Sequence, residues 1–177
     1  SSFGNDIEQK VREHHESNGG MSRFKKIPLY LEWSKQTVTS ATVKNYCDQF
    51  SRLVTDAVIK SPWVEGVQEF LRKHSSDKTF FLLTATPQRE IEEILNTLQI
   101  TDYFKEIAGA PSSKANAMGD ILRRYTIDSE EAVMIGDSKN DYLAANEHGV
   151  VFILRKTRHN AALQSVLECQ MINEFTE

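Results

Sequence analysis

Hydrophobic positions in the first third of the chain recur with the spacing of an α-helix. This pattern covers the segments Ile7–His14, Arg23–Lys35 and Val38–Ile59, and the polar sequence SNGG separates the first two. Pro28 is expected near a turn, and Pro62 closes the region. No part of the region shows the alternation or the apolar run that predicts a strand. The first third is therefore predicted to be entirely helical.

Beyond residue 62, short apolar runs alternate with amphipathic segments. The runs are continuous rather than alternating, which is typical of strands buried on both faces. The four predicted strands are 79–85, 104–110, 132–137 and 150–155. The predicted helices are 64–74, 86–100, 112–125, 141–149 and 160–168. Pro87 suits a place at or near the first position of its helix, Ser112 or Ser113 suits an N-cap, and Gly149 suits the position just past a helix C-terminus.

Strands that alternate with helices indicate βαβ units. We therefore predict an α/β fold with a Rossmann-like parallel sheet covered by helices on both faces. The boundary between the two kinds of structure falls near Pro62. The predicted domains are an all-helical domain over residues 1–61 and an α/β domain over residues 62–177.

The charge balance and the cysteines mainly disfavour certain classes of protein and of site. Lys and Arg total 21 against 25 Asp and Glu, a net charge of −4, which disfavours a general nucleic-acid-binding protein. Cys47 and Cys169 form no C-x-x-C pattern, so neither a disulfide framework nor a zinc site is indicated. No apolar run approaches the ~18 residues that cross a bilayer, and no signal peptide is visible. We expect a cytoplasmic protein that binds neither nucleic acid nor a membrane.

Ligands of open parallel sheets bind at the carboxyl ends of the strands, so the residues after each strand are considered together. These residues are, strand by strand, Thr84, Ala85, Thr86 and Pro87; Gly109, Ala110 and Lys114; Gly136, Asp137, Ser138 and Asp141; Arg155 and Lys156. A hydroxyl, an ammonium and backbone N–H groups suit a phosphate. Carboxylates such as Asp137 and Asp141 suit Mg²⁺. The set predicts a phosphoryl-transfer site that uses Mg²⁺.

Each of these residues also has a purely structural interpretation. Thr84 suits the end of a strand. Lys114 lies in the first turn of a helix, where a cation opposes the dipole, so a specific role gains weight, although exposed lysines are common. Asp137 and Asp141 both suit N-caps, and this interpretation fits Asp141 better, because Asp137 directly follows a buried strand and a glycine. Neither G-x-G-x-x-G nor G-x-x-x-x-G-K-[ST] occurs, which disfavours a dinucleotide site or a P-loop.

Three segments, in this order, resemble motifs of the haloacid dehalogenase-like superfamily. FFLLTAT (residues 80–86), Lys114 and MIGDSKND (residues 134–141) are similar to its second, third and fourth motifs. The helical first part resembles the small cap domain that the family inserts before the second motif. GGMSRF (residues 19–24) is similar to a cap segment of the phosphoglycolate phosphatase and β-phosphoglucomutase-like branch, in which the arginine reaches the substrate. A solvated arginine at a helix start is an equally good interpretation of Arg23.

The resemblance implies a mechanism in which an aspartate attacks phosphorus and water hydrolyses the aspartyl-phosphate. It implies that Thr84 and the backbone N–H of Ala85 bind the phosphoryl oxygens. It also implies that Lys114 offsets negative charge and that Asp137 binds Mg²⁺. Asp141 would lie in or beside the metal shell, where it orients waters or Lys114.

One part of the family pattern is absent: the sequence contains no D-x-D. In the family this first motif ends the central strand and carries the nucleophile, the acid/base and a metal ligand. A sheet without its central strand would leave two edges facing each other with unpaired N–H and C=O groups. We expect the chain to be an incomplete version of the protein that lacks roughly 20–30 residues, the length of one strand and its exit loop.

The first hypothesis for function is a Mg²⁺-dependent phosphatase that acts on a small phosphorylated metabolite. A phosphomutase on the same scaffold is the close alternative, and a dehalogenase has no need for Mg²⁺ or for the two aspartates. A non-catalytic family member that binds a phosphorylated ligand or a partner protein is the alternative from another class. A receiver-like or nucleotide-binding domain is disfavoured by the helical first third. The expected assembly is a monomer or a homodimer.

Overall fold

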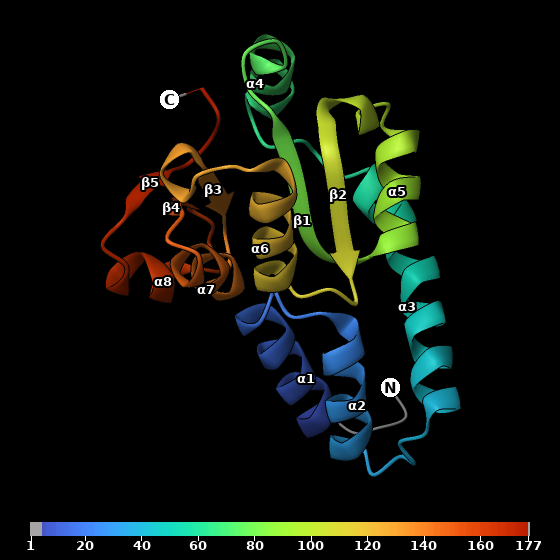
Figure 1. Cartoon of the computed structure of the whole chain (residues 1–177). Helices are drawn as coiled ribbons and strands as arrows, with labels where there is room; N and C mark the ends of the chain where they lie inside the picture. Colours follow the sequence, from blue (N-terminus) through green and yellow to red (C-terminus); the bar gives the residue numbers. More distant parts are fainter. Residues whose placement is uncertain (1–4, 177) are drawn as a thin grey trace.

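The structure is a computed structural model, and it describes residues 5–176, which form a helical unit and an α/β unit (Figure 1). The helical unit consists of α1 (Asn5–Ser17), α2 (Arg23–Trp33) and α3 (Ser40–Ile59). The helices of the α/β unit are α4 (Val67–His74), α5 (Gln88–Thr97), α6 (Lys114–Tyr125), α7 (Lys139–Glu147) and α8 (Ala161–Val166). Its strands are β1 (Phe80–Pro87), β2 (Phe104–Ala110), β3 (Val133–Gly136), β4 (Val151–Arg155) and β5 (Gln170–Ile172).

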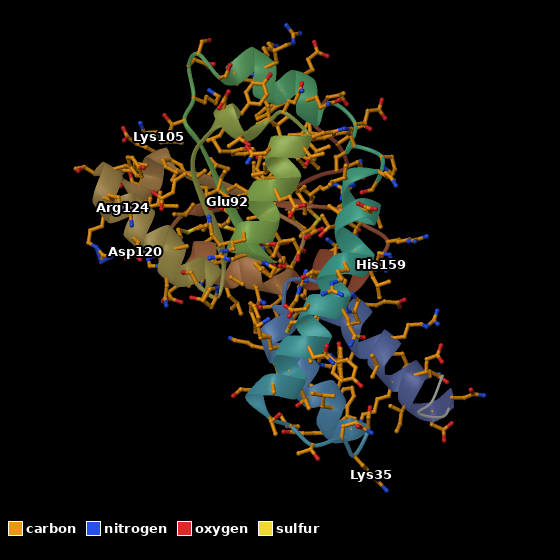
Figure 2. All side chains as sticks on the ribbon, turned by 90° about the vertical axis from the view of Figure 1, so that its right-hand side faces the viewer. Lys35, Glu92, Lys105, Asp120, Arg124 and His159 are labelled. Atoms are coloured by element: carbon orange, nitrogen blue, oxygen red, sulfur yellow. The ribbon has the colours of Figure 1, made fainter. Side chains whose placement is uncertain are left out.

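The helical unit extends from one end of the α/β unit, as Figure 2 shows with Lys35 pointing outward at the far tip. Other labelled charged side chains, such as Lys105 and Arg124, project from the α/β unit into solvent (Figure 2). Within residues 5–176, no helix is both long enough and apolar enough to cross a bilayer.

Packing between α2 and α3 holds the helical unit together. Ile27 and Leu31 of α2 pack on the buried Cys47 of α3. Pro28 lies inside α2, so its predicted place near a turn is wrong. A proline in a helix removes one backbone hydrogen bond, and the apolar contacts of its neighbours hold the helix in spite of that loss.

β1 pairs in parallel with β2, and β1 is covered on both faces. The ring of Phe81 lies 5.1 Å from that of Tyr125 in α6, whereas the ring of Phe80 lies 5.9 Å from that of Phe70 in α4. Because consecutive side chains of a strand point to opposite faces, α4 and α6 lie on opposite sides of β1. This arrangement confirms the predicted α/β class with helices on both faces.

The predicted first strand, 79–85, continues in the structure to Pro87. Pro87 still pairs with Ala110 of β2 and is the N-cap of α5, one residue before its first position, which confirms its predicted place at or near that position. Two other predicted helix ends are confirmed. Ser113 accepts a hydrogen bond from the Asn116 N–H as the N-cap of α6, and Gly149 follows α7 with a φ of 68°.

β3, β4 and β5 form a second parallel sheet. The larger core lies between this sheet and α7. Its buried residues include Met134, Phe152 and Leu154 of the sheet and Ala144 and Ala145 of α7. Among the described residues, the opposite face of β3 and β4 carries exposed side chains: Val133, Ile135 and Val151.

The prediction of four strands is wrong by one, because the described residues contain five. β5 pairs Gln170 and Ile172 with β4 and has only three residues, which is too short for a periodic pattern. The predicted final helix, 160–168, is also shorter in the structure. It ends at Val166, so the chain can turn back to form β5.

Among residues 5–176, no backbone pairing joins β1 to β3, so the strands form two sheets instead of one. In the view of Figure 1, β3 and β1 lie on either side of α6. Two sheets without pairing between β1 and β3 agree with the expectation above for a sheet without its central strand. The carboxyl ends of β1 and β3 point toward the helical unit.

Candidate active site

A cavity of about 450 Å³ lies between the helical unit and the carboxyl ends of β1 and β3. The α/β unit contributes five lining residues to it: Thr84, Ala85, Thr86, Lys114 and Asp137. The helical unit contributes the opposite wall, which includes His15, Gly20, Arg23, Lys26 and Phe50. Five of the six residues predicted from the sequence therefore line one cavity, and the sixth, Asp141, lies directly behind Lys114.

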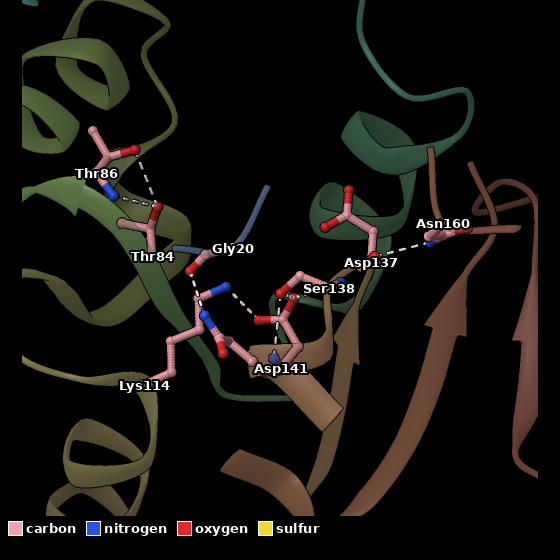
Figure 3. A network of polar contacts seen from close by, with 9 residues as sticks. Gly20, Thr84, Thr86, Lys114, Asp137, Ser138, Asp141 and Asn160 are labelled. Atoms are coloured by element: carbon pink, nitrogen blue, oxygen red, sulfur yellow. Dashed lines mark hydrogen bonds and ion pairs between the residues drawn. The ribbon is translucent and has the colours of Figure 1, made fainter. Parts of the chain in front are cut away.

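The end of β1 presents hydroxyl and backbone groups to the cavity. The Thr86 N–H donates to Thr84 Oγ1 over 3.1 Å, and the two hydroxyls are 3.2 Å apart (Figure 3). These bonds fix the Thr84 side chain at the point where the strand stops. A fixed hydroxyl at the end of a strand can bind phosphate oxygens without reorganisation.

Lys114 and Asp141 form a buried ion pair that joins the first turns of α6 and α7. The two side chains are 15% and 4% exposed. The unfavourable position of a cation at a helix N-terminus is offset by the neighbouring carboxylate. Figure 3 shows the Lys114 ammonium pointing toward Asp141 and held in place beside the cavity.

Both carboxylate oxygens of Asp141 accept hydrogen bonds. Oδ1 accepts from Lys114, whereas Oδ2 accepts from the backbone N–H of Ser138 at 3.0 Å and from its hydroxyl at 2.7 Å. Asp141 therefore completes a capping box of α7 and orients Lys114 at the same time. Of the roles weighed from the sequence, this geometry favours helix capping and the orientation of Lys114 over direct coordination of a metal.

Gly136 makes room for the Asp141 side chain. A Cβ atom at Gly136 would lie 2.5 Å from Asp141 Cγ and 2.7 Å from its Oδ2, which is closer than van der Waals contact allows. The glycine between β3 and Asp137 is thus needed for the approach of Asp141 to the end of the strand.

Asp137 has a different environment from that of Asp141. Its backbone carbonyl accepts from Asn160 Nδ2 at 2.9 Å, and the same amide donates to the carbonyl of Arg155, which ties the ends of β3 and β4 together. Its carboxylate lines the cavity, is exposed, and takes no hydrogen bond or ion pair from the described residues. Asn160 was not among the residues predicted from the sequence: its Oδ1 accepts from the nearby Thr157 N–H and Gln164 amide, but its contact with Asp137 spans 23 residues.

The donor chemistry at this edge fits Mg²⁺ better than a metal held by protein ligands alone. Within residues 5–176, no group of three or more His, Cys, Asp or Glu side chains comes together as a metal site. Mg²⁺ keeps several waters and binds through one or two carboxylates plus a substrate phosphate. One unpaired carboxylate, that of Asp137, beside a phosphate-binding edge satisfies this requirement.

Arg23 lines the cavity, but its guanidinium is bound to other side chains. Nη1 and Nη2 donate to the two oxygens of Glu90 at 2.8 and 2.6 Å, and Nη1 also donates to Ser51 Oγ at 2.5 Å. The guanidinium carbon lies 4.6 Å above the ring of Phe50. The sequence placed Arg23 at the cavity, whereas its partner Glu90, 67 residues away, left no local signal.

The two units also touch at the edge of the cavity through α7. Asn140 Nδ2 donates to the carbonyl of Gly20 at 2.8 Å (Figure 3). Gly20 lies so close to Ser138 that a Cβ atom there would overlap the serine side chain. These contacts and the Arg23–Glu90 pair bring the helical unit against the mouth of the cavity from two sides.

Lys26 is a lining residue that the sequence patterns did not single out. It is only 4% exposed, and burial lowers the pKa of its ammonium. Partial removal from water lowers the pKa of the nearby His15, and the charge of Lys26 lowers it further. The available signal was the helical spacing, because Lys26 lies next to Ile27 and four residues before Tyr30, on the apolar side of α2.

Comparison with known proteins agrees with this geometry. The profile of the family described as haloacid dehalogenase-like hydrolase matches residues 8–154. A phosphoglycolate phosphatase from Vibrio vulnificus (strain CMCP6) is 35% identical over 89 residues. That alignment covers 47% of this chain and 39% of the relative, so the matched region spans less than half the length of the curated relative.

Solved structures share the fold along nearly the whole chain. A mutant of CbbY from Rhodobacter sphaeroides, in complex with xylulose-(1,5)bisphosphate, superposes with a TM-score of 0.77 at 16% identity and covers 94% of this chain and 79% of that one. A predicted phosphoglycolate phosphatase from Haemophilus somnus 129PT gives a TM-score of 0.72 at 16% identity over 97% of this chain and 84% of that one. At these identities the likeness shows the fold alone.

Proposed function

The chain belongs to the haloacid dehalogenase-like hydrolase family, and on that basis we propose that the full-length protein is a Mg²⁺-dependent phosphatase of a small phosphorylated metabolite. The observation that carries the proposal is the convergence of Thr84, Lys114 and Asp137 on one cavity at the carboxyl ends of the strands. The similarity to phosphoglycolate phosphatase in sequence supports the substrate class. The helical unit, residues 1–61 in the proposed domain division, would act as the cap over this cavity.

Different residues of the site would bind different parts of a phosphoryl group. The Thr84 hydroxyl and the backbone N–H of Ala85 would hold its oxygens, and the Lys114 ammonium would offset its charge. Asp141 keeps Lys114 in place through their ion pair. Asp137 would hold Mg²⁺, which supplies charge neutralisation to the phosphate when bound.

The attacking group of the family mechanism belongs to a D-x-D motif, and residues 1–177 contain no such sequence. The proposed aspartyl-phosphate mechanism is therefore a statement about the full-length protein. The same observation favours a second candidate, a non-catalytic family member that binds a phosphorylated ligand at this cavity. The two candidates share the binding residues and differ in turnover.

Hydrolysis of p-nitrophenyl phosphate by the full-length protein, with and without Mg²⁺, tests the proposal. We expect turnover that requires Mg²⁺ and that falls at least about 100-fold in Lys114→Ala and Asp137→Asn, as happens when one preorganised charged group is removed. Lys105→Ala and Asp102→Asn make the same changes at exposed residues outside the cavity and serve as controls. Phosphate binding without turnover would favour the non-catalytic candidate, and undiminished turnover in both site variants would refute the assignment.

Two coarser properties complete the proposal. We place the protein in the cytoplasm, which agrees with the free thiols of Cys47 and Cys169. We also propose a monomer or a homodimer, which a measurement of molar mass in solution would distinguish.

A further inference from the structure

The wall of the cavity formed by the helical unit contains a buried lysine, Lys26, that pairs with no carboxylate of residues 5–176. Lys26 projects from α2 and is 4% exposed, while Thr84, Lys114 and Asp137 line the same cavity from the α/β unit. The hydrogen bond of its Nζ runs to the backbone carbonyl of His15 over 3.4 Å, which is longer than the usual range of about 2.7–3.2 Å for such bonds.

The other cations of the cavity are neutralised. Arg23 is paired with Glu90, and Lys114 is paired with Asp141. Among the described residues, Lys26 takes part in no ion pair. A buried ammonium without a counter-charge is unfavourable, and the lowered pKa of Lys26 reflects this burial.

A purely structural role explains only part of this arrangement. The carbonyl of His15 lies near the C-terminus of α1, where a cation is favourable. An ammonium carries three N–H donors, however, and the described residues accept one long bond from it. The remaining donors are on a side chain that lines the cavity, where an anionic ligand would satisfy them.

From this geometry we propose that Lys26 binds a second anionic group of the substrate, at the end remote from the phosphoryl group. The substrate would then be a small phosphorylated compound that also carries a carboxylate or a second phosphate. This inference rests on the proposed function, because Thr84 and Lys114 define the phosphoryl end. It assigns charge recognition on the helical unit to Lys26 instead of Arg23, whose guanidinium is already bound by Glu90.

Three non-hydrolysable probes separate the second anion from the first. Phosphonoacetate carries a carboxylate beside its phosphonate, ethylenediphosphonate carries a second phosphonate, and ethylphosphonate carries neither. Their dissociation constants for the full-length protein in Mg²⁺ would be measured by calorimetry. A charged hydrogen bond predicts that the wild type binds at least one of the two probes with a second anionic group about 10-fold or more tightly than ethylphosphonate. The probe with the larger preference identifies a carboxylate or a phosphate as the group.

The variant Lys26→Met should bring that preference close to one. Lys25→Met is the matched control, because Lys25 precedes it on α2, is exposed and loses the same charge. Lys26→Arg keeps the charge, so it should retain part of the preference if recognition is electrostatic. Thermal unfolding of each variant would show that it is folded.

The outcomes separate the two proposals. A wild type that binds the three probes equally, or a Lys26→Met variant that keeps the preference, overturns the role of Lys26. Hydrolysis of p-nitrophenyl phosphate in the absence of any such preference would leave the phosphatase proposal standing. A protein that binds none of the probes and hydrolyses no p-nitrophenyl phosphate would overturn both.

Discussion

The guanidinium of Arg23 and the carboxylate of Glu90 form a two-bond ion pair that joins α2 of the helical unit to the first turn of α5. The two side chains are 10% and 8% exposed, so the pair is largely removed from water. Glu90 is also favourably placed at a helix N-terminus. The pair therefore connects the helical unit to the unit that carries Thr84, Lys114 and Asp137.

Removing the charge of Glu90 should destabilise the protein, because Arg23 would remain buried without a counter-charge. For Glu90→Gln we expect a loss of about 3 kcal/mol of unfolding free energy. The midpoint of thermal unfolding should fall by roughly 6–12 °C for a chain of this size. Glu93→Gln changes an exposed residue of the same helix and should leave the midpoint almost unchanged. Equal midpoints for the two variants would show that the buried pair does not stabilise the fold.

Asp141→Asn should lower both stability and activity, because it leaves Lys114 buried without a counter-charge and no longer orients its ammonium. The amide can still accept the hydrogen bonds of Ser138, but it removes the negative charge beside the ammonium. We expect kcat to fall about 10-fold or more, as expected for the loss of a charged hydrogen bond. Ser138→Ala is the matched variant that weakens the capping box and leaves the ion pair. A fall in kcat that is the same in both would indicate that capping alone matters.

Two adjacent glycines give a test of the contact between the units. A methyl group at Gly20 would overlap the side chain of Ser138, whereas no atom lies within 4 Å of the corresponding position at Gly19. Gly20→Ala should destabilise the protein by about 1–3 kcal/mol through overpacking. Gly19→Ala should be neutral or stabilising by up to about 1 kcal/mol, because it restricts the unfolded chain. Chemical denaturation of both variants would measure the difference, and equal effects would contradict the close contact.

Lys26→Met should stabilise the unliganded protein at neutral pH. The folded protein holds the pKa of Lys26 below its unfolded value of about 10.4, so the buried charge lowers stability below the folded pKa. Stability from this group should therefore rise with pH as Lys26 loses its proton in the folded state, up to the unfolded pKa.

We expect Lys26→Met to raise the unfolding midpoint at pH 7 by about 2–4 °C, which corresponds to about 1 kcal/mol. Its advantage over the wild type should shrink as the pH rises toward the unfolded pKa of lysine. Thermal unfolding at several pH values, with Lys25→Met as the control, would measure this. A midpoint lowered by Lys26→Met at pH 7 would instead show that its bond to His15 stabilises the fold.

The local patterns of the sequence determined the class of the fold and the place of the cavity. The apolar runs that end at Thr84 and at Gly136 predicted parallel strands, and parallel strands bring their carboxyl ends to one edge. That rule alone was enough to group Thr84, Lys114 and Asp137. Ser113 and Gly149 were predictable in the same way, because helix caps depend on residues within one turn.

The tertiary structure decided the partners of the charged residues. Arg23 and Glu90 are 67 residues apart in the sequence, and Lys114 and Asp141 are 27 apart. The periodicity of hydrophobic residues cannot predict contacts between residues so far apart. The separation of β1 from β3 and the added strand β5 also depend on pairing between distant segments. Local patterns are set by the geometry of one helix or strand, whereas a buried charge is neutralised only by what the fold brings to it. For that reason the sequence indicated the edge at which we propose that a phosphate binds, and only the structure showed that Lys26 has no counter-charge among residues 5–176.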